Sequence, residues 1–237
     1  MSFKLGNTNI SELYVGSTKI GSAYLGSTKV YEGTAPGPTP IILPDYTIRL
    51  KFTEGVTPSW YEGTAVQVSS SPNIWDLTYN NSNWDVLLQN QSNLLEILGA
   101  NTSNVTSMRN IFNYCSSLTD VSLFDTSNVT SMLRMFASCS SLTSVPLFNT
   151  SNVADMSRMF YQCTSLTSIP LFNTSKVTTM SYMFNNCRNV ESGALALYQQ
   201  ASSQTNPPSS HLSTFTNCGK NTTTGAVELA QIPRDWK

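Results

Sequence analysis

The stretch DTSNVTSMLRMFASCSSLTSVPLF, residues 125–148, decides the fold, because the chain repeats it with a period of 24 residues. It is preceded by NTSNVTSMRNIFNYCSSLTDVSLF at 101–124 and followed by NTSNVADMSRMFYQCTSLTSIPLF at 149–172 and NTSKVTTMSYMFNNCRNV at 173–190. Each copy holds one cysteine: Cys115, Cys139, Cys163 and Cys187. A fixed period of this length is typical of a solenoid, whose units bury their apolar sides against their neighbours. Function is therefore expected on a repetitive surface rather than in a single pocket.

The apolar spacing within one copy predicts a short helix and a short strand. Met132, Met135, Phe136 and Cys139 lie at i, i+3, i+4 and i+7, which is one face of an α-helix. The residues just before them, 126–128, carry side-chain oxygens that can cap the first amide groups. The apolar run 142–147, broken at Pro146, suits a strand with one irregular step.

We therefore predict an α/β fold: a solenoid of turn, helix and strand coils whose strands form a parallel sheet, which the resemblance named below identifies as a leucine-rich-repeat solenoid. A small N-terminal all-β segment and a β cap precede it. One repeat earlier, Trp84 and Gln91 take the Met and Cys places of a degraded first copy, as expected for a terminal unit. Near the other end, Leu212, Phe215 and Cys218 echo the helix motif after an insertion.

The front of the chain carries a different repeat, of ten residues: LGNTNISELY, VGSTKIGSAY and LGSTKVYEG, from residue 5 onward. Its Gly-Asn-Thr and Gly-Ser-Thr triplets favour tight turns between short strands. Such strands have little core of their own, so we expect them to dock on another copy, domain or particle. The residues predicted to make this contact are Ile10, Tyr14, Ile20, Tyr24, Val30 and Tyr31.

Further on, the stretch YTIRLKF predicts a strand with Ile48, Leu50 and Phe52 inward and Thr47, Arg49 and Lys51 outward, and a second strand is expected at 65–68. The predicted organisation has five parts: a docking segment at 1–32, a Pro-rich linker at 33–44, an N-terminal β cap at 45–76, the repeats at 77–188, and a C-terminal cap at 189–237.

Composition excludes several classes of function. Charged residues make up 11% of the 237 residues and the net charge is −1, so we expect no nucleic-acid partner. No run is apolar and long enough to span a bilayer, and the first thirty residues do not resemble a secretory signal. We therefore expect no membrane insertion. Because the sequence begins at Met1, we expect a whole translated product. The surface is expected to be rich in Ser, Thr and Asn.

The repeat text resembles the BspA-like leucine-rich repeats of bacterial surface proteins over roughly residues 77–196. This resemblance implies a binding or adhesion scaffold and supplies no catalytic residues. The ten-residue repeats before a Pro-rich hinge resemble the leading segments of virion proteins in phages of gut Bacteroides-type hosts, of the crAss-like kind. This second resemblance implies a phage structural protein.

Catalytic and metal sites are poorly supported. The cysteines lack a Cys-x-x-Cys pair, so we interpret them as buried structural thiols and expect no metal and no cofactor. His211 has neighbouring serines but no nucleophile elbow, and we expect it to be an exposed loop residue. Asp120, Asp125 and Asp155 occupy unlike repeat positions, which argues against paired carboxylates. We predict that the protein is not an enzyme. The Asn residues of the NVT triplets, such as Asn104 and Asn128, are expected to bond turn backbones from coil to coil.

Positions that vary between the copies mark the candidate binding surface, on the helix face opposite Met and Phe. They are the columns that begin at residues 109, 110, 113 and 114 and recur in the next three copies. They place Arg134, Arg158 and Tyr182 in one column, with Tyr114 and Tyr161 nearby. Arg and Tyr are frequent anchors of interfaces. The alternative is a merely solvated face.

The leading hypothesis is a non-enzymatic virion protein, a head or tail fibre or decoration. Its N-terminus would dock on other virion proteins, and its repeats would bind a host cell-surface protein or glycan. We expect a homo-oligomer, a trimer by analogy with fibres, located in the virion. The alternative is a BspA-like adhesin at the bacterial cell surface. A glycan-cleaving enzyme would require a cleft with two facing carboxylates.

Overall fold

The computed structural model describes the side chains of residues 43–59, 62–122 and 124–237. Before residue 43 it describes the backbone of six short strands. The chain divides into two units, Met1–Ile42 and Leu43–Lys237, and each is considered by itself.

The six strands of the first unit form antiparallel pairs. β1 (Phe3–Leu5) pairs with β2 (Thr8–Ile10), β3 (Leu13–Val15) with β4 (Thr18–Ile20), and β5 (Ser22–Leu25) with β6 (Thr28–Glu32). The short strands predicted from the ten-residue repeat are therefore present, one pair per copy. The six predicted docking residues lie on these strands, but their side chains lie outside the described part, as do residues 33–42 of the predicted linker.

The second unit begins with a mixed, open sheet of five strands in the order β11-β10-β7-β9-β8. Its strands are β7 (Thr47–Phe52), β8 (Thr64–Ser70), β9 (Asn73–Thr78), β10 (Leu94–Ala100) and β11 (Asp120–Val121). β10 and β11 are parallel and the other neighbours antiparallel. The C-terminal region contains helices α1 (Ala194–Ser202) and α2 (Thr223–Gln231) and the 3₁₀ turn η1 (Arg234–Trp236).

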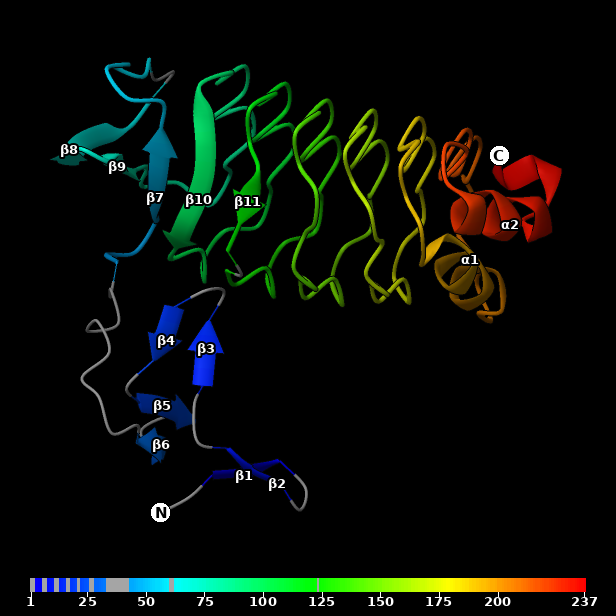
Figure 1. Ribbon diagram of the computed structural model, residues 1–237, viewed down its shortest axis with the longest axis horizontal. Coiled ribbons are helices and arrows are strands. Elements are labelled where there is room, and N and C mark those ends of the chain that lie inside the picture. The colour runs from blue at the N-terminus through cyan, green and yellow to red at the C-terminus, as the bar shows by residue number, and fades with distance from the viewer. Residues whose placement is uncertain are drawn as a thin grey trace. The chain divides into compact units, whose positions relative to one another are not determined.

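The predicted helix-turn-strand solenoid is wrong. Among the described residues, the regular structure is mostly sheet with two short helices, and neither helix lies within residues 101–190. Each copy of the repeat is instead a coil of consecutive turns. Successive coils lie side by side between the five-stranded sheet at one end and the two helices at the other (Figure 1).

Backbone hydrogen bonds explain why the apolar spacing did not produce a helix. The amides of Arg134 and Phe136 donate to the carbonyls of Ser157 and Met159 in the next coil, at 3.0 and 2.9 Å. The intervening amide of Met135 donates to Met132 three residues earlier, at 3.1 Å, where an α-helix requires a partner four residues earlier. This ladder places the Met, Phe and Cys side chains on one side, as a helix would, so the pattern alone could not separate the two structures.

The predicted strand after the cysteine is also absent from the copies at 125–148 and 149–172, and proline is the reason. The amides of Phe148 and Phe172 donate to the carbonyls of Pro146 and Pro170, two residues earlier, at 3.0 and 2.9 Å. These three-residue turns interrupt an extended chain. They leave Leu147 60% exposed and bury Phe148, so the leucine predicted to belong to an apolar strand faces solvent.

The core consists of columns of identical side chains, as predicted for Met, Phe and Cys. Successive rings stack with centroids 5.3 Å apart for Phe112 and Phe136, 5.7 Å for Phe136 and Phe160, and 5.2 Å for Phe160 and Phe184. Trp84 is fully buried at the start of the Met column. One hydrophobic cluster extends from Ile48 to Trp236.

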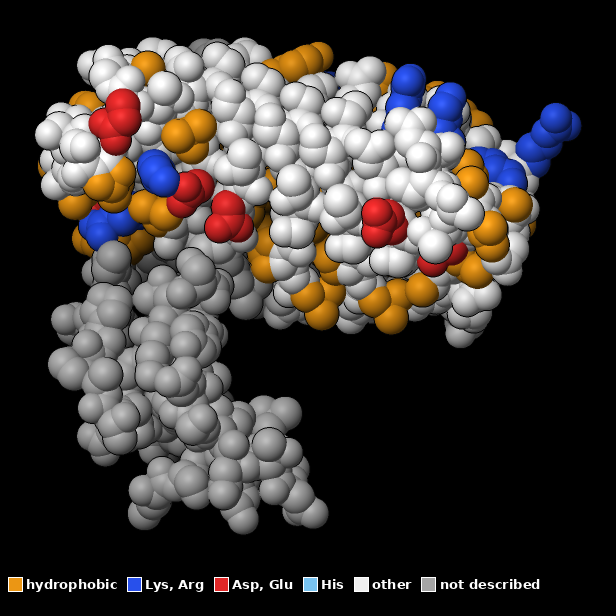
Figure 2. Space-filling model, viewed as in Figure 1, with side chains coloured by type: hydrophobic (Ala, Val, Ile, Leu, Met, Phe, Trp, Pro, Cys, Tyr) orange, Lys and Arg blue, Asp and Glu red, His pale blue; other side chains and the backbone are white. Residues whose placement is uncertain are grey.

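The visible outer surface is largely uncharged, with scattered acidic and basic side chains (Figure 2). Polar side chains link one coil to the next. Asn128 Nδ2 donates to the Ser103 carbonyl at 2.6 Å and Asn152 Nδ2 to the Ser127 carbonyl at 2.7 Å, which confirms the predicted role for Asn128. The buried Thr126 hydroxyl donates to the carbonyl of Asn149 at 2.9 Å.

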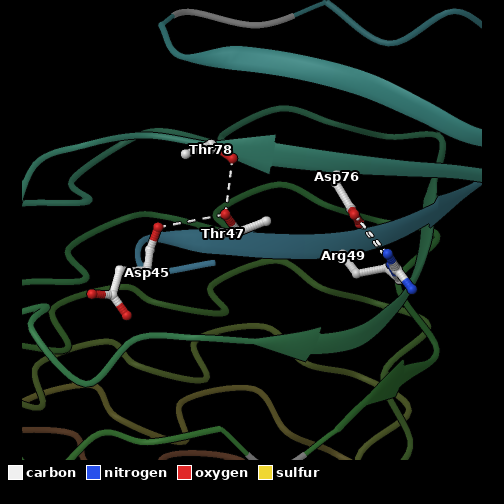
Figure 3. Close-up of polar contacts among 5 residues, drawn as sticks. All are labelled: Asp45, Thr47, Arg49, Asp76 and Thr78. Carbon is white, nitrogen blue, oxygen red and sulfur yellow. Dashed lines mark hydrogen bonds and ion pairs between the residues drawn. The ribbon is translucent and has the colours of Figure 1, made fainter. Parts of the chain in front are cut away.

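The N-terminal β cap follows the predicted pattern with one exception. Ile48, Leu50 and Phe52 are buried, but so is Thr47, which was predicted to face outward. The hydroxyls of Thr47 and Thr78 are 2.8 Å apart, so a hydrogen bond satisfies both in the interior. Beside them, Arg49 on β7 makes a two-pronged ion pair with Asp76 on β9 (Figure 3), through Nε and Nη2, each at 2.6 Å.

The C-terminal cap adds a partial further coil. The amides of Tyr182 and Phe184 donate to the carbonyls of Leu212 and Thr214, at 2.9 and 2.8 Å. Phe215 and Cys218 are buried as the motif predicted, whereas Leu212 is 58% exposed and was wrongly aligned with the core. The indole of Trp236 lies 6.4 Å from the Phe215 ring and closes the aromatic column.

Candidate binding site

The cysteines belong to the core. All five are unpaired and buried, and the Sγ atoms of Cys139 and Cys163 donate to the carbonyls of Phe112 and Phe136 in the preceding coil, at 3.2 and 3.0 Å. Burial raises the pKa of the Cys163 thiol to about 12, so it is protonated at neutral pH. A protonated buried thiol is a poor nucleophile and metal ligand. Within the residues whose side chains are described, no group of three or more His, Cys, Asp or Glu could hold a metal ion.

His211 is a packing residue of the cap, not the exposed loop residue that was predicted. It follows Ser210, which accepts the Met180 amide, and therefore takes the place that Met occupies in earlier coils. Its half-buried ring stacks on Trp236 with centroids 4.2 Å apart, and Nε2 lies 3.4 Å from a carboxylate oxygen of Asp235.

The three acidic residues considered for hydrolysis each accept a backbone amide close in sequence. Asp120 accepts from Val121 at 2.9 Å, Asp125 from Ser127 at 2.8 Å and Asp155 from Ser157 at 2.9 Å. Such contacts stabilise turns.

A depression of about 500 Å³ crosses four successive coils. Four of the five predicted site residues line it: Tyr114, Arg134, Arg158 and Tyr161. The fifth, Tyr182, lies at its edge through a contact with Arg158, whose guanidinium carbon is 4.7 Å from the centre of the tyrosine ring. The volume is within the range of small-ligand sites, and the depression is open to solvent.

The remaining lining residues are Gln89, Asn110, Asn113, Ala137 and Ser138. Most belong to the variable columns, although Asn113 and Ala137 are buried rather than fully outward as predicted, because the turns of the coil bring this column under its neighbours. Sequence reasoning missed Gln89. Extending the column one period back from Asn113 would have found it.

Acidic partners of the two arginines are absent from the part of the chain with described side chains. There, neither Arg134 nor Arg158 forms an ion pair, and no Asp or Glu lines the depression. Adjacent coils therefore present two guanidinium groups that no described carboxylate neutralises. Such groups can bind anions by paired hydrogen bonds.

The backbone beneath these side chains is strained. Arg134, Arg158 and Tyr182 have φ of 53°, 55° and 60°, in the left-handed region. Asparagine and glycine enter this region more readily than Arg or Tyr. The equivalent position of the other coils has the same conformation, from Val86 and Asn110 to Ser213, so it belongs to the turn of the repeat.

None of the helices in the described part has the length and apolar character needed to cross a membrane. No curated protein and no solved structure matches the chain significantly. Residues 79–196 match the model of a family described as "Mycoplasma protein of unknown function, DUF285". Over this stretch the chain is similar to that family, which is consistent with a BspA-like repeat protein.

Proposed function

We propose that this chain is a non-enzymatic recognition protein whose repeats bind a protein or glycan on a host cell surface. The observation that carries the proposal is the Arg- and Tyr-lined depression on an otherwise mainly uncharged surface. Its residues come from separate coils, so the stacked repeats act as a rigid frame for a surface site. The absence of carboxylates from its lining supports binding rather than hydrolysis.

Binding to whole cells tests this proposal. Labelled full-length protein would be added to a panel of gut Bacteroides-type cells, and bound label measured by flow cytometry. The double variant Arg134→Gln and Arg158→Gln should bind less, whereas Arg188→Gln, which removes an exposed arginine outside the depression, should bind as the wild type does. Equal binding by all three proteins would overturn the proposal.

We further propose that residues 1–32 attach the protein to a phage particle, as a head or tail fibre or decoration. The paired short strands of this segment support the proposal, because isolated two-stranded hairpins are marginal alone and gain stability by packing on a partner. Deleting 1–32 should abolish incorporation into particles, measured by mass spectrometry of purified virions, and leave circular dichroism of the second unit unchanged. Unchanged incorporation would refute this role.

A second candidate is an adhesin at the bacterial cell surface, favoured by the family match, which is consistent with BspA-like repeats. Fractionation of a native source separates the two proposals. An adhesin appears in the cell envelope, and a virion protein copurifies with particles. Size-exclusion chromatography with light scattering tests the accompanying proposal of a homo-oligomer.

A further inference from the structure

We infer that the depression binds a linear acidic polysaccharide, with sugar carboxylates paired to Arg134 and Arg158. This inference rests on the proposed function, because it names the ligand class of the same site. It follows from the charge of the two arginines, the shape of the depression and the chemistry of its lining.

The charge favours an anionic ligand. The two guanidinium groups belong to equivalent positions of adjacent coils and lack acidic partners in the described part of the chain. Two like charges at neighbouring positions repel each other, so an anion that lies between them is stabilised by both. A carboxylate matches the planar fork of arginine and can accept two hydrogen bonds from it.

The shape favours a linear polymer. The lining residues run from Gln89 in the first coil, through Tyr114 and Arg134, to Arg158 and Tyr161 in the fourth. Hydrogen-bonded neighbouring chains are about 4.8 Å apart, so three steps extend roughly 14 Å. The depression therefore presents equivalent positions at a regular step along its length, as a polymer with one charge per sugar ring would require.

The lining favours a sugar over an acidic peptide. Asn110 and Ser138 supply amide and hydroxyl groups that can bond sugar hydroxyls. Tyr114, which is 56% exposed, and Tyr161 also line the depression. The partial negative charge on the faces of their rings attracts the C–H groups of a sugar ring. Among the described lining residues only Ala137 is aliphatic, which leaves little apolar surface for the buried anchors of a protein partner.

One of the two arginines already contacts a neighbouring ring. Arg158 lies over the Tyr182 ring at 4.7 Å, which limits the conformations of its side chain before the ligand arrives. Less conformational entropy is then lost on binding. Arg134, with no such contact, is expected to become ordered with the ligand.

Isothermal titration calorimetry of the full chain tests the inference, with polygalacturonate as the probe. The same polymer with its carboxyl groups reduced to alcohols is the uncharged control, and poly-glutamate is the acidic peptide control. We expect binding of polygalacturonate that weakens with added salt, little binding of the reduced polymer, and weaker binding of poly-glutamate. Arg134→Asn and Arg158→Asn should each lower the affinity by roughly tenfold, and Arg188→Gln should leave it unchanged.

Asparagine fits the left-handed backbone at both positions, so a loss of binding in these variants would not reflect unfolding. Thermal melting of each variant checks that it is folded. Equal binding of the reduced polymer would overturn the acidic ligand class while leaving the proposed recognition function standing. Preference for poly-glutamate, or no binding of any probe, would overturn the inference. After any of these outcomes, the cell-binding assay tests the proposed function independently.

Discussion

At Arg134 and Arg158 the side chains that form the site stand on a left-handed backbone, with φ of 53° and 55°. The same column holds Asn110, which suits that conformation, so the arginines are not required by the turn itself. The residues that give the depression its charge therefore cost stability, and the buried columns beneath compensate.

The first prediction concerns this cost. Arg134→Asn should raise the free energy of unfolding by up to about 1 kcal/mol, because asparagine enters the left-handed region more easily. Arg158→Asn should raise the free energy of unfolding by less, because this variant also loses the contact with Tyr182. Urea denaturation followed by circular dichroism measures both. A loss of stability in Arg134→Asn would show that the backbone there is not strained.

A second prediction concerns the buried thiols and pH. An ordinary thiol has a pKa of 9.0, and burial raises that of Cys163 to about 12. Between these values the unfolded chain releases a proton that the folded chain keeps, so the free energy of unfolding falls by about 1.4 kcal/mol per pH unit for this thiol. The stability that the protonated Cys163 thiol contributes is fully present below pH 9.0 and is lost as the pH rises toward about 12.

The comparison of wild type with Cys163→Ala isolates this effect, since all other titratable groups are the same in both proteins. The alanine variant should be less stable at neutral pH. Between pH 9 and 11, however, its free energy of unfolding should fall less steeply with pH, because the unfolded variant has one fewer proton to release. Urea denaturation at a series of alkaline pH values gives both slopes. Parallel slopes would mean that the thiol is not buried in the folded protein.

At the scale of elements, the sequence predicted strands better than it predicted the repeats. β7 was predicted because Ile48, Leu50 and Phe52 alternate with polar residues, and all three are buried. β8 was predicted at 65–68 and extends over Thr64–Ser70. In the repeats, apolar spacing indicated which side chains are buried but not whether an amide donates within its own coil or to the next one. That choice produced turns instead of helices.

The pairing of β7 with β9 supplies a third prediction. The Arg49–Asp76 pair is two-pronged, with both side chains less than one quarter exposed, at 16% and 20%. Burial of the pair and its fixed geometry should give a coupling free energy of about 1 kcal/mol in a double-mutant cycle with Arg49→Met and Asp76→Leu. The matched control is Lys51–Glu96, which joins β7 to β10, makes a single contact and is more exposed, at 30% and 29%. Its coupling should be smaller, and equal couplings would contradict the argument.

At the scale of the whole second unit, stability comes from contacts between neighbouring coils. The hydrogen bonds that leave one coil mostly reach the adjacent coils, and the Phe rings stack in the same sequence. Such an array is approximately a sum of coil and interface terms. The ends differ, because strands β7, β8 and β9 extend the sheet beyond the first coil, to which β10 belongs, and Trp236 with the helices covers the last coil.

A fourth prediction follows from this arrangement. Deleting residues 125–148 joins Phe124 to Asn149 in the same phase of the repeat, so the protein should fold with one coil fewer. Its urea m-value should fall roughly in proportion to the surface lost. Deleting 125–136, half a period, breaks the phase of every column and should prevent cooperative unfolding. Both deletions are assessed by circular dichroism and urea titration, and equal behaviour would argue against phase-dependent stacking.

The sequence by itself determined the period, the buried columns of Met, Phe and Cys, the strand β7 and the variable positions that hold Arg134, Arg158 and Tyr182. Burial follows apolar spacing, whereas variation between copies indicated exposure only in part, because Asn113 and Ala137 vary and are buried. Only the tertiary structure decided that the coils are turns, that Leu147 faces solvent and that His211 packs on Trp236. It also decided that Gln89 and Tyr161, far apart in the chain, line one depression. The physical reason is that these outcomes depend on hydrogen bonds and contacts between coils, and a pattern read within one copy carries no information about its neighbour.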